Sequence, residues 1–549
     1  MSFFFKRNAV YLIKYVFGGW SMMEKEFNIT GTCIPSENYM VNIDSKLREI
    51  KNMIEKKRYF TINRGRQYGK TTTLFMLSNE IKNDYVVIRL TFEHTTNENL
   101  FKNEQGFCQG FLEKISKALK VTNYKKAYYE SWLNKDVKTF ETLGEHITIM
   151  CEIDKVVLMI DEVDKASNNL LFLGFLSMLR SKFLLRREGL DCTFHSVILA
   201  GVYDIKNIKL KMISEGLHIP TELEGKIHNS PWNIAINFKV DMSFSTQEIK
   251  TMLIDYENDY QTGMDISHIA EEIRFYTGGY PVLVSSICKY MDEDLNNWTA
   301  AGVREAVRLL VGETENPLFR GLSQNLEGHI EVYQLLHDVL ISGVNFPFST
   351  LDPAVDLANR YGYIYKQNDR VIISNKIFEM VMTDYFVIKD MRRLRISSKS
   401  SWFSDITRTG KFDMAMCLER FQTHWYELYN EKEGEFLENQ CRMIFMTYLR
   451  PFLNGNGFYF IESATTDDRR MDLVVTYGNE RFIVEMKIWR GDAYNQKGID
   501  QLLGYMDKYN EIKGYLLTFD FRKNPKPLTP QWIQHSTKEI FEVRVSKKI

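Results

Sequence analysis

At 549 residues, the chain is longer than one hydrophobic core usually supports, so several domains are expected. The composition is 44% hydrophobic and 26% charged, which is typical of a globular protein and excludes a disordered or fibrous one. Because the net charge is −1, a uniformly basic nucleic-acid binder is excluded, and any surface for nucleic acid has to be local.

The seven cysteines are scattered and include no CxxC pair, which argues against a disulfide framework or a zinc site and favours a reducing, cytoplasmic compartment. Residues 1–23 are apolar but are interrupted by Lys6, Arg7 and Lys14, so they predict neither a signal peptide nor a membrane span. A helix on a membrane surface is one interpretation. We favour an extension ahead of a true start at Met22 or Met23, and expect no membrane partner.

The stretch YFTINRGRQYGKTTTLFML (59–77) is a β-rich run followed by a glycine-containing loop and a helix that opens at Lys70. In this context backbone N–H groups and a helix N-terminus face a phosphate. Lys70 would reach the β- and γ-phosphates of a nucleotide, and Thr71 would offer its hydroxyl to Mg²⁺. The usual first glycine of such a loop is replaced by Arg64, with a glycine following at 65. The predicted nucleotide-binding residues here are Gly65, Gln67, Tyr68, Gly69, Lys70, Thr71 and Thr72.

The segment KVVLMIDEVDKA (155–166) is a continuous apolar run that ends in two acids, Asp161 and Glu162. Parallel strands buried on both faces have this pattern, and acids at their carboxyl ends point into the ligand crevice. Asp161 is therefore predicted to hold Mg²⁺ as a Walker B carboxylate, and Glu162 to orient the water that attacks the nucleotide.

Further strands are predicted at 85–90, 196–201 and 234–238. The intervening strand and the glutamate after the Mg²⁺ aspartate resemble the additional-strand, catalytic-glutamate ATPases, which include AAA+ and STAND proteins. No guanine-reading motif occurs, so ATP is expected. Possible arginine fingers, equally well explained as solvated helix residues, are Arg180, Arg186 and Arg187.

From residue 241 the pattern is helical, and Ser245 with Glu248 form a predicted capping box. Gly278, Gly279 and Pro281 resemble a nucleotide-contacting element of STAND lids, although a plain helix–turn–helix link has the same pattern. Residues 358–382 read as a helix, two strands joined by an Asn368–Asp369 turn, and a helix, which predicts a winged helix. We expect this winged helix to pack against other domains rather than to bind DNA.

A basic stretch follows, and it either contacts a phosphate backbone or forms a solvated interdomain helix. Its basic residues are Lys389, Arg392, Arg393, Arg395 and Lys399.

The strand RFIVEMKIWRG (481–491) places Glu485 and Lys487 on one face, because side chains alternate along a strand. A turn at Gly478–Asn479 predicts a hairpin that brings Asp472 beside Glu485, so that the two carboxylates can share a divalent cation. Lys487, on the same face, can act on a metal-bound water.

Two helices flank this predicted hairpin. The upstream helix carries Glu435 and Glu438, and the downstream helix carries Gln501 and Tyr505 four residues apart. The order of acidic helix, D-x12-E-x-K hairpin, QxxxY helix and last strand resembles the PD-(D/E)XK nuclease superfamily, and the QxxxY element resembles that of RecB-type members. The proline that usually precedes the aspartate is replaced by Met471.

Residues 30–525 together resemble an AAA-ATPase-like, STAND-related P-loop module fused to a C-terminal PD-(D/E)XK nuclease domain. The implied fold is multidomain α/β, with a parallel P-loop sheet, a helical lid and a winged helix ahead of a restriction-endonuclease-like α/β domain. Expected boundaries are 1–23 for the extension, 24–240 for the ATPase, 241–326 for the lid, 327–392 for the winged helix, 393–430 for a basic helical linker and 431–549 for the nuclease-like domain.

The resemblance implies ATP and Mg²⁺ as cofactors, with Mn²⁺ as an alternative at the nuclease site. The implied catalytic residues are Glu162, Asp472, Glu485, Lys487 and Gln501. The implied metal ligands are Thr71, Asp161, Glu438, Asp472 and Glu485. The expected function is ATP-regulated cleavage of nucleic acid, DNA before RNA, in defence or DNA processing, with self-assembly through the ATPase domain. The alternative is an ATP-driven switch whose nuclease-like domain only binds nucleic acid or a partner. A helicase-like motor is disfavoured because no second motor domain is recognisable.

Overall fold

The computed structural model of the chain describes residues 25–92, 101–122, 137–163, 170–202, 232–313, 315–342, 344–394, 411–428, 438–453, 457–461, 472–478, 480–522, 525 and 528–546. The predicted extension at 1–23, the basic residues Arg395 and Lys399, and Glu435 lie outside these described residues.

The N-terminal unit is built on a parallel sheet of four strands in the order β1-β4-β3-β2. The strands are β1 (Tyr59–Asn63), β2 (Val86–Thr91), β3 (Val156–Asp161) and β4 (Ser196–Gly201). Every residue of β3 and β4 is buried, as expected for strands covered on both faces. The strand between β1 and β3 in the sheet is β4, whereas β2, which lies between the two motifs in sequence, is at the edge beside β3. The parallel sheet with its helices confirms the P-loop ATPase α/β fold.

The fifth predicted strand, 234–238, is wrong in extent. A single parallel bridge joins Ile236 to Phe60, and Ile236 N donates to Tyr59 O at 2.9 Å. The chain turns just before this bridge, since Ala235 N donates to Trp232 O at 3.1 Å. An edge segment that turns in this way can pair at only one position.

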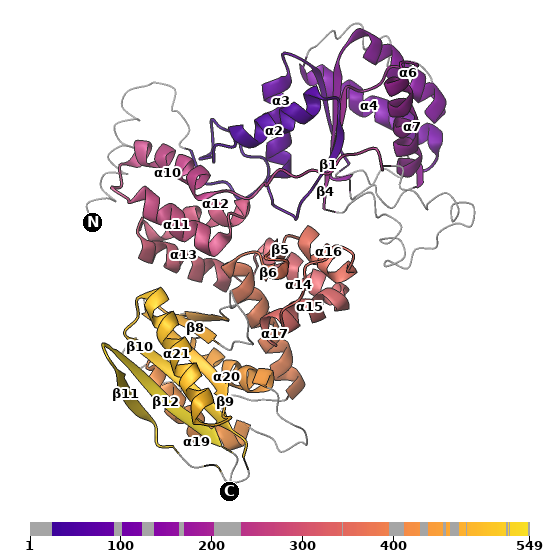
Figure 1. Cartoon of the computed structure of the whole chain (residues 1–549). Coiled ribbons are helices and arrows are strands. Elements are labelled where there is room, and N and C mark those ends of the chain that lie inside the picture. Colours follow the sequence, from indigo (N-terminus) through magenta and orange to yellow (C-terminus); the bar gives the residue numbers. More distant parts are fainter. Residues whose placement is uncertain are drawn as a thin grey trace.

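Helices cover both faces of this sheet (Figure 1). One face packs against α2 (Asp44–Glu55) and α3 (Lys70–Ile81), and its core includes Phe60, Ile62 and Leu74. The opposite face packs against α4 (Glu104–Thr122), α6 (Phe140–Ile153) and α7 (Leu170–Glu188). Alternate strand residues supply the two cores because side chains alternate across a strand.

The middle of the chain is mostly helical. The region predicted as the lid, called the lid below, comprises α10 (Thr246–Tyr260), α11 (Ile266–Thr277), α12 (Pro281–Tyr290), the π-helix η3 (Met291–Leu295) and α13 (Ala300–Gly312). The capping box predicted for Ser245 and Glu248 is confirmed at the start of α10.

The region predicted as a winged helix follows the lid. It comprises α14 (Pro317–Gly328), α15 (Ile330–Leu340), α16 (Pro353–Arg360), β5 (Ile364–Gln367), β6 (Arg370–Ile373) and α17 (Lys376–Leu394). Strands β5 and β6 pair as an antiparallel hairpin, and both turn residues, Asn368 and Asp369, adopt positive φ, as two-residue hairpin turns require.

The C-terminal unit has a mixed sheet of six strands in the order β11-β12-β10-β9-β8-β7. The strands are β7 (Gly457–Ile461), β8 (Asp472–Tyr477), β9 (Glu480–Ile488), β10 (Lys513–Asp520), β11 (Gln531–His535) and β12 (Lys538–Ser546). Strand β10 runs parallel to β9 and β12, and the other pairs are antiparallel.

Helices α19 (Met414–Leu428) and α20 (Glu438–Leu453) cover one face of this sheet, and α21 (Asp492–Tyr509) covers the other. Helix α19 falls in the predicted linker but packs against β10 and β12, so the C-terminal unit includes residues ahead of 431.

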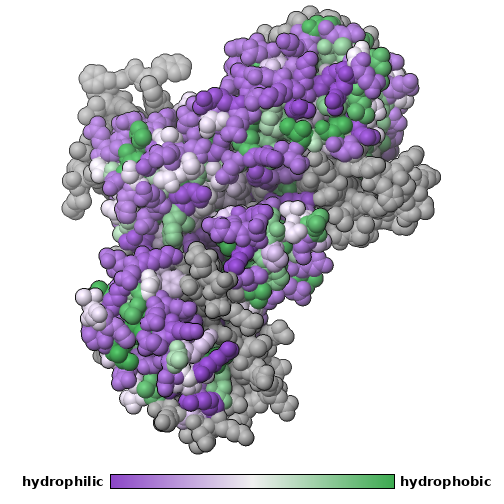
Figure 2. Space-filling model, viewed as in Figure 1, coloured by the Kyte–Doolittle hydropathy of each residue, from purple (hydrophilic) through white to green (hydrophobic). Residues whose placement is uncertain are grey.

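Helix α17 joins the units, because it contacts lid helices α11 and α13 as well as β7 and α20 of the C-terminal unit (Figure 1). The face drawn in Figure 2 is mostly hydrophilic, with smaller hydrophobic groups concentrated over the N-terminal unit. Within the described residues, no helix is long and apolar enough to cross a membrane.

Candidate nucleotide and nuclease sites

The loop between β1 and α3 has the backbone that a phosphate site requires. Gly69, which precedes the first helical residue, adopts φ +75°, and Gln67 adopts φ +56°. The second value is unusual for a residue other than glycine, and such strain concentrates in functional loops. Helix α3 then begins at Lys70, so its free N–H groups face the loop.

Lys70 and Thr71 are the first two residues of α3, beside the loop. The Lys70 ammonium donates to Arg64 O and Gly65 O, both at 2.9 Å, and the side chain is buried. The Thr71 hydroxyl donates to Asp161 Oδ2 at 2.6 Å. The structure thus brings the start of α3 and the end of β3 together, although they are 90 residues apart in sequence.

Asp161 and Glu162 end strand β3 beside this loop. Asp161 Oδ1 accepts the backbone N–H of Glu162 at 2.9 Å, and Glu162 itself adopts φ +54°. A left-handed backbone at a non-glycine residue is costly, and it turns the Glu162 side chain away from the direction that a continuing strand would give it.

The turn between α11 and α12 contacts the phosphate loop. Tyr280 donates its hydroxyl hydrogen to Arg66 O at 2.5 Å, and its ring meets that of Tyr68 edge-on at 4.6 Å. Burial raises the pKa of Tyr280 well above its ordinary value, so the hydroxyl stays protonated as a donor. Pro281 lies against Gly69, with its Cβ at 3.9 Å from the position of a Cβ on that glycine.

The winged-helix region also reaches the loop. A Cβ placed on Gly65 would lie 2.5 Å from Tyr361 O, so only glycine allows this close approach of two backbones. The glycine at 65, one position later than in the usual pattern, therefore lies in contact with a different domain.

A cavity of 330 Å³ lies beside Gly69 and Thr72. Its lining is mainly apolar and comes from the segment ahead of α2, from α3 and from the lid. The apolar residues include Met40, Val41, Met76, Met242, Phe244, Pro281 and Val282. An apolar cleft next to a phosphate loop suits a nucleotide base.

Of that lining, the sequence prediction includes Gln67, Tyr68, Gly69, Thr72 and Pro281. The other lining residues belong to no local sequence motif. The apolar run ahead of α2, which includes Met40 and Val41, is the one feature of the sequence that could have indicated some of them. The tertiary fold brings them together: Cys33 N donates to the Thr72 hydroxyl at 3.2 Å, and Lys46 pairs with Glu248 at 2.7 Å.

Two of the candidate arginine fingers, Arg180 and Arg186, donate hydrogen bonds within the ATPase unit. Arg186 donates to Lys57 O at 3.0 Å and to His195 O at 3.1 Å, and its guanidinium lies over the Tyr59 ring. Arg180 donates to Asn233 at 2.9 Å. These contacts support structural roles for Arg180 and Arg186, whereas Arg187 is exposed.

In the C-terminal unit, strands β8 and β9 pair so that Asp472 lies directly opposite Glu485. Directly opposite residues in an antiparallel pair project from the same face. The predicted juxtaposition of these two backbone positions is therefore confirmed. Lys487 follows two residues later on the face that α21 covers.

Glu485 and Lys487 form a buried ion pair, with Lys487 Nζ at 2.7 Å from Glu485 Oε1 and with side-chain exposures of 5% for the lysine and 0% for the glutamate. The approach does not have hydrogen-bond geometry, and neither carboxylate oxygen of Glu485 has a hydrogen-bond partner among the described residues. Leaving buried charged oxygens with unused acceptor capacity is costly, and a bound cation would relieve this cost.

Helix α21 packs directly on this pair. A Cβ on Gly498 would lie 3.3 Å from Lys487 Cγ, so a larger residue there would press on the lysine. Gln501, three residues later on the same helix, has a buried Oε1 with no hydrogen-bond partner in the described part of the chain. Tyr505 is buried in the core under the helix.

Glu438 is the first residue of α20, but its side chain, like that of Asp472, lies outside what the structure describes. Among the described residues, no group of three or more His, Cys, Asp or Glu side chains is placed to hold a metal ion.

Polar residues that the sequence prediction missed continue the row across the sheet. Thr518 lies beside Lys487 in the β9–β10 register and is fully buried. Asn495 of α21 donates to Glu542 Oε1 at 3.0 Å and accepts from the Thr518 hydroxyl at 3.4 Å. The packing of α21 on β10 and β12 places these residues together, through the hydrogen bonds of Asn495 to both strands, and the sequence holds no signal for that packing.

The parallel sheet, the loop at the start of α3 and the Thr71–Asp161 contact define a P-loop ATPase. A family model described as AAA-like domain matches residues 34–386, so the chain belongs to the AAA-like domain family. The match covers the ATPase unit, the lid and most of the winged-helix region, and it ends ahead of the C-terminal unit.

Several solved structures are similar to parts of the chain. A Walker-type ATPase of Pyrococcus abyssi has a TM-score of 0.45 and 10% identity, covering 65% of this chain and 99% of its own. The ORC2 protein of Aeropyrum pernix, in ADPNP–ADP complexes, has a TM-score of 0.39 and 12% identity, covering 67% and 100%. The ORC1 protein of Aeropyrum pernix, in complex with DNA, has a TM-score of 0.27 and 11% identity, covering 64% and 94%. Among curated proteins none matches the chain. The family assignment rests on residues 34–386 alone.

Proposed function

We propose that the protein is an ATP-regulated, Mg²⁺-dependent nuclease that cuts DNA in preference to RNA. The observation that carries the proposal is the buried Glu485 carboxylate, which lies opposite Asp472 and beside Lys487 with neither oxygen hydrogen-bonded among the described residues. The Lys487 ammonium forms an ion pair with only one of these oxygens and outside hydrogen-bond geometry, so acceptor capacity that a divalent cation could use stays open.

At the nucleotide site, ATP would place its base in the apolar cavity and its phosphates against Gly69 and Lys70. The Lys70 ammonium now donates to the carbonyls of Arg64 and Gly65. When ATP binds, phosphate oxygens would replace these carbonyls as its acceptors. Thr71 and Asp161, already 2.6 Å apart, are the residues that would hold Mg²⁺ there. Glu162 would orient the attacking water.

At the nuclease site, Asp472 and Glu485 would hold Mg²⁺ or Mn²⁺, with Glu438 as a further ligand. When bound, the cation supplies an activated water and offsets charge on the phosphate. Lys487 would position that water and offset negative charge as the phosphodiester is attacked. Gln501 of α21 would support the pair, since its buried Oε1 has no hydrogen-bond partner among the described residues.

The test is cleavage of single- and double-stranded DNA by the full chain and by Glu485→Gln. The substitution keeps the side-chain volume but removes the charge, so we expect cleavage to fall at least about 100-fold, the range in which groups acting on the reacting proton contribute. Glu539→Gln, on the same sheet at the start of β12, is the matched control and retains wild-type cleavage. Unchanged cleavage in Glu485→Gln would overturn the proposal.

A second candidate function is an ATP-driven switch whose C-terminal unit binds nucleic acid or a partner without cutting it. The contact between Gly65 and Tyr361 favours this candidate, because the winged-helix region lies directly against the phosphate loop. A nucleotide that moves the loop would then move the winged-helix region and allow assembly through the ATPase unit. The switch predicts an ATP-dependent increase in molecular mass by light scattering, with no cleavage.

A further inference from the structure

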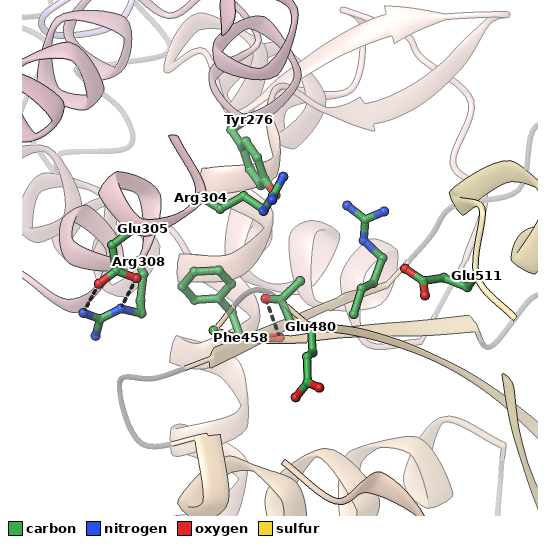
Figure 3. Close-up of a pocket in the computed structure, with 10 residues that line it drawn as sticks. Tyr276, Arg304, Glu305, Arg308, Phe458, Glu480 and Glu511 are labelled. Atoms are coloured by element: carbon green, nitrogen blue, oxygen red, sulfur yellow. Dashed lines mark hydrogen bonds and ion pairs between the residues drawn. The ribbon is translucent and has the colours of Figure 1, made fainter. Parts of the chain in front are cut away.

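The lid meets the C-terminal unit at a small cavity that belongs to neither candidate site. The cavity has a volume of 180 Å³ and is lined by Tyr276 and Arg304 of the lid and by Glu480, Arg481 and Glu511 of the C-terminal unit. Figure 3 shows Tyr276 and Arg304 side by side above Phe458 and Glu480, with Glu511 on the other side. Two lid helices thus face the turn end of the β8–β9 hairpin.

Arg481 lies between the two units. Its guanidinium lies 4.8 Å from the Tyr509 ring centroid, and its buried Nε has no hydrogen-bond partner among the described residues. Burial and Glu272 raise the pKa of Tyr276, and the charges of Arg481 and Arg304 oppose that rise. Burial also raises the pKa of the Glu511 carboxyl, and the charge of Arg481 opposes that rise. Arg481 therefore lines a cavity together with lid residues and lies over Tyr509 of its own unit.

The strand that carries Arg481 also carries the candidate nuclease pair. Residues 481, 485 and 487 of β9 project from one face, because their positions differ by even numbers. The hairpin has a continuous register from Asp472↔Glu485 to Tyr477↔Glu480. A displacement of Arg481 along the strand therefore reaches Glu485.

The other end of the connection lies at the phosphate loop. Helix α11 ends at Thr277, one residue after Tyr276, and Tyr280 bonds Arg66 O. The turn between them is tightly enclosed: a Cβ on Gly278 would lie 2.4 Å from Ser374 O, and one on Gly279 would lie 2.0 Å from Phe244 O. If the phosphate loop moves, it moves this turn through Tyr280. Because the turn is packed so closely, the end of α11 has to move with it.

We propose that Tyr276 and Arg481, which line one cavity between the lid and the C-terminal unit, transmit the nucleotide state of the phosphate loop to the β8–β9 hairpin. The inference rests on the proposed function, since it names how ATP would regulate the nuclease site. ATP would favour one position of the α11 end, and the hairpin would follow through Arg481, as a coupling free energy between two distinct sites requires.

Hydrogen exchange of the full chain, with and without ATP and Mg²⁺, tests this without using cleavage. In the wild type we expect ATP to change exchange both in the loop (64–73) and in the hairpin (473–487). In Arg481→Ala the change at the loop persists and the change in the hairpin is lost. Arg308→Ala is the matched control: its guanidinium lines the same cavity and pairs with Glu305 of its own helix, so both changes persist.

The outcomes separate the inference from the proposed function. A wild type with an ATP response at the loop but none in the hairpin overturns the inference and leaves the proposed ATP binding intact. A hairpin response that survives in Arg481→Ala also overturns it. No response at the loop contradicts ATP binding itself. Should Arg481→Ala not fold, Tyr276→Phe, which keeps the ring and removes the hydroxyl, is expected to weaken the hairpin response, and an unchanged response would count against the inference.

Discussion

Lys70 is a buried ammonium held by two loop carbonyls at the start of α3. Such a group is stable only where its charge is compensated, and carbonyl oxygens compensate it incompletely. A triphosphate at the adjoining helix N-terminus would compensate it fully. At the residue scale, therefore, the burial of Lys70 is explained by the ligand that it would bind.

Replacing Lys70 with alanine should weaken ATP binding severely. A hydrogen bond to a charged group contributes about 1.5–3 kcal/mol, which corresponds to a loss of roughly 10- to 150-fold in affinity. Titration calorimetry with ATP and Mg²⁺ measures this directly. Lys82→Ala removes an exposed lysine just after the same helix and should bind as wild type; equal affinities for the two variants would remove Lys70 from the nucleotide site.

At the scale of elements, the turn between α11 and α12 is the most constrained connection near the phosphate loop. Gly278 and Gly279 both adopt positive φ, and Phe244 N donates to Gly279 O at 2.8 Å. The turn therefore fixes the start of the lid, the end of α11 and the position of Tyr280 together. Its sequence, GGYP, resembles a nucleotide-contacting element of STAND lids and fits a plain helix–turn–helix link equally well. The contact between Tyr280 and Arg66 O favours the first interpretation.

Gly279→Ala should destabilise the lid by about 1–3 kcal/mol, because the new methyl group would overlap Phe244 O in a backbone conformation that alanine disfavours. Gly312→Ala is the control: this glycine lies at the end of α13, and no atom lies within 4 Å of the place that its new methyl group would take. Differential scanning calorimetry should show an earlier first transition for Gly279→Ala only. An unshifted transition would mean that the turn is not closely packed in solution.

The sequence predicts features that depend on local order. The P-loop, the β3 strand with its two acids, the hairpin turn at Asn368–Asp369 and the pairing of Asp472 with Glu485 all follow from period, spacing and turn chemistry. These features are correct because neighbouring residues determine them.

Features that join distant segments are not predictable in this way. The apolar cavity combines Met40 with Met242 and Val282, and the smaller cavity combines Tyr276 of the lid with Arg481 of the C-terminal unit. The predicted strand at 234–238 fails because Trp232 directs the chain into a turn and donates its indole N–H to Thr61 at 2.9 Å, a contact across 171 residues.

At the scale of the whole molecule, α17 holds the two halves together. From α20, Arg442 donates to Ile341 O at 2.9 Å, and Arg450 pairs with Asp384 of α17. Buried hydrophobic residues form one continuous core. It runs from the face of the ATPase sheet that α2 and α3 cover, through the lid, to β7, β8 and β9. This arrangement makes the position of the C-terminal unit depend on the lid (Figure 1).

The most direct test of ATP-regulated cleavage is a nuclease assay on single- and double-stranded DNA with Mg²⁺ or Mn²⁺, run with and without ATP. It compares the wild type with Lys487→Ala and Lys70→Ala. We expect the wild type to cut with a rate that ATP changes, Lys487→Ala to lose cleavage, and Lys70→Ala to cut at a rate that no longer responds to ATP. A wild type that hydrolyses ATP but cuts no substrate under any of these conditions would contradict the nuclease and leave the switch.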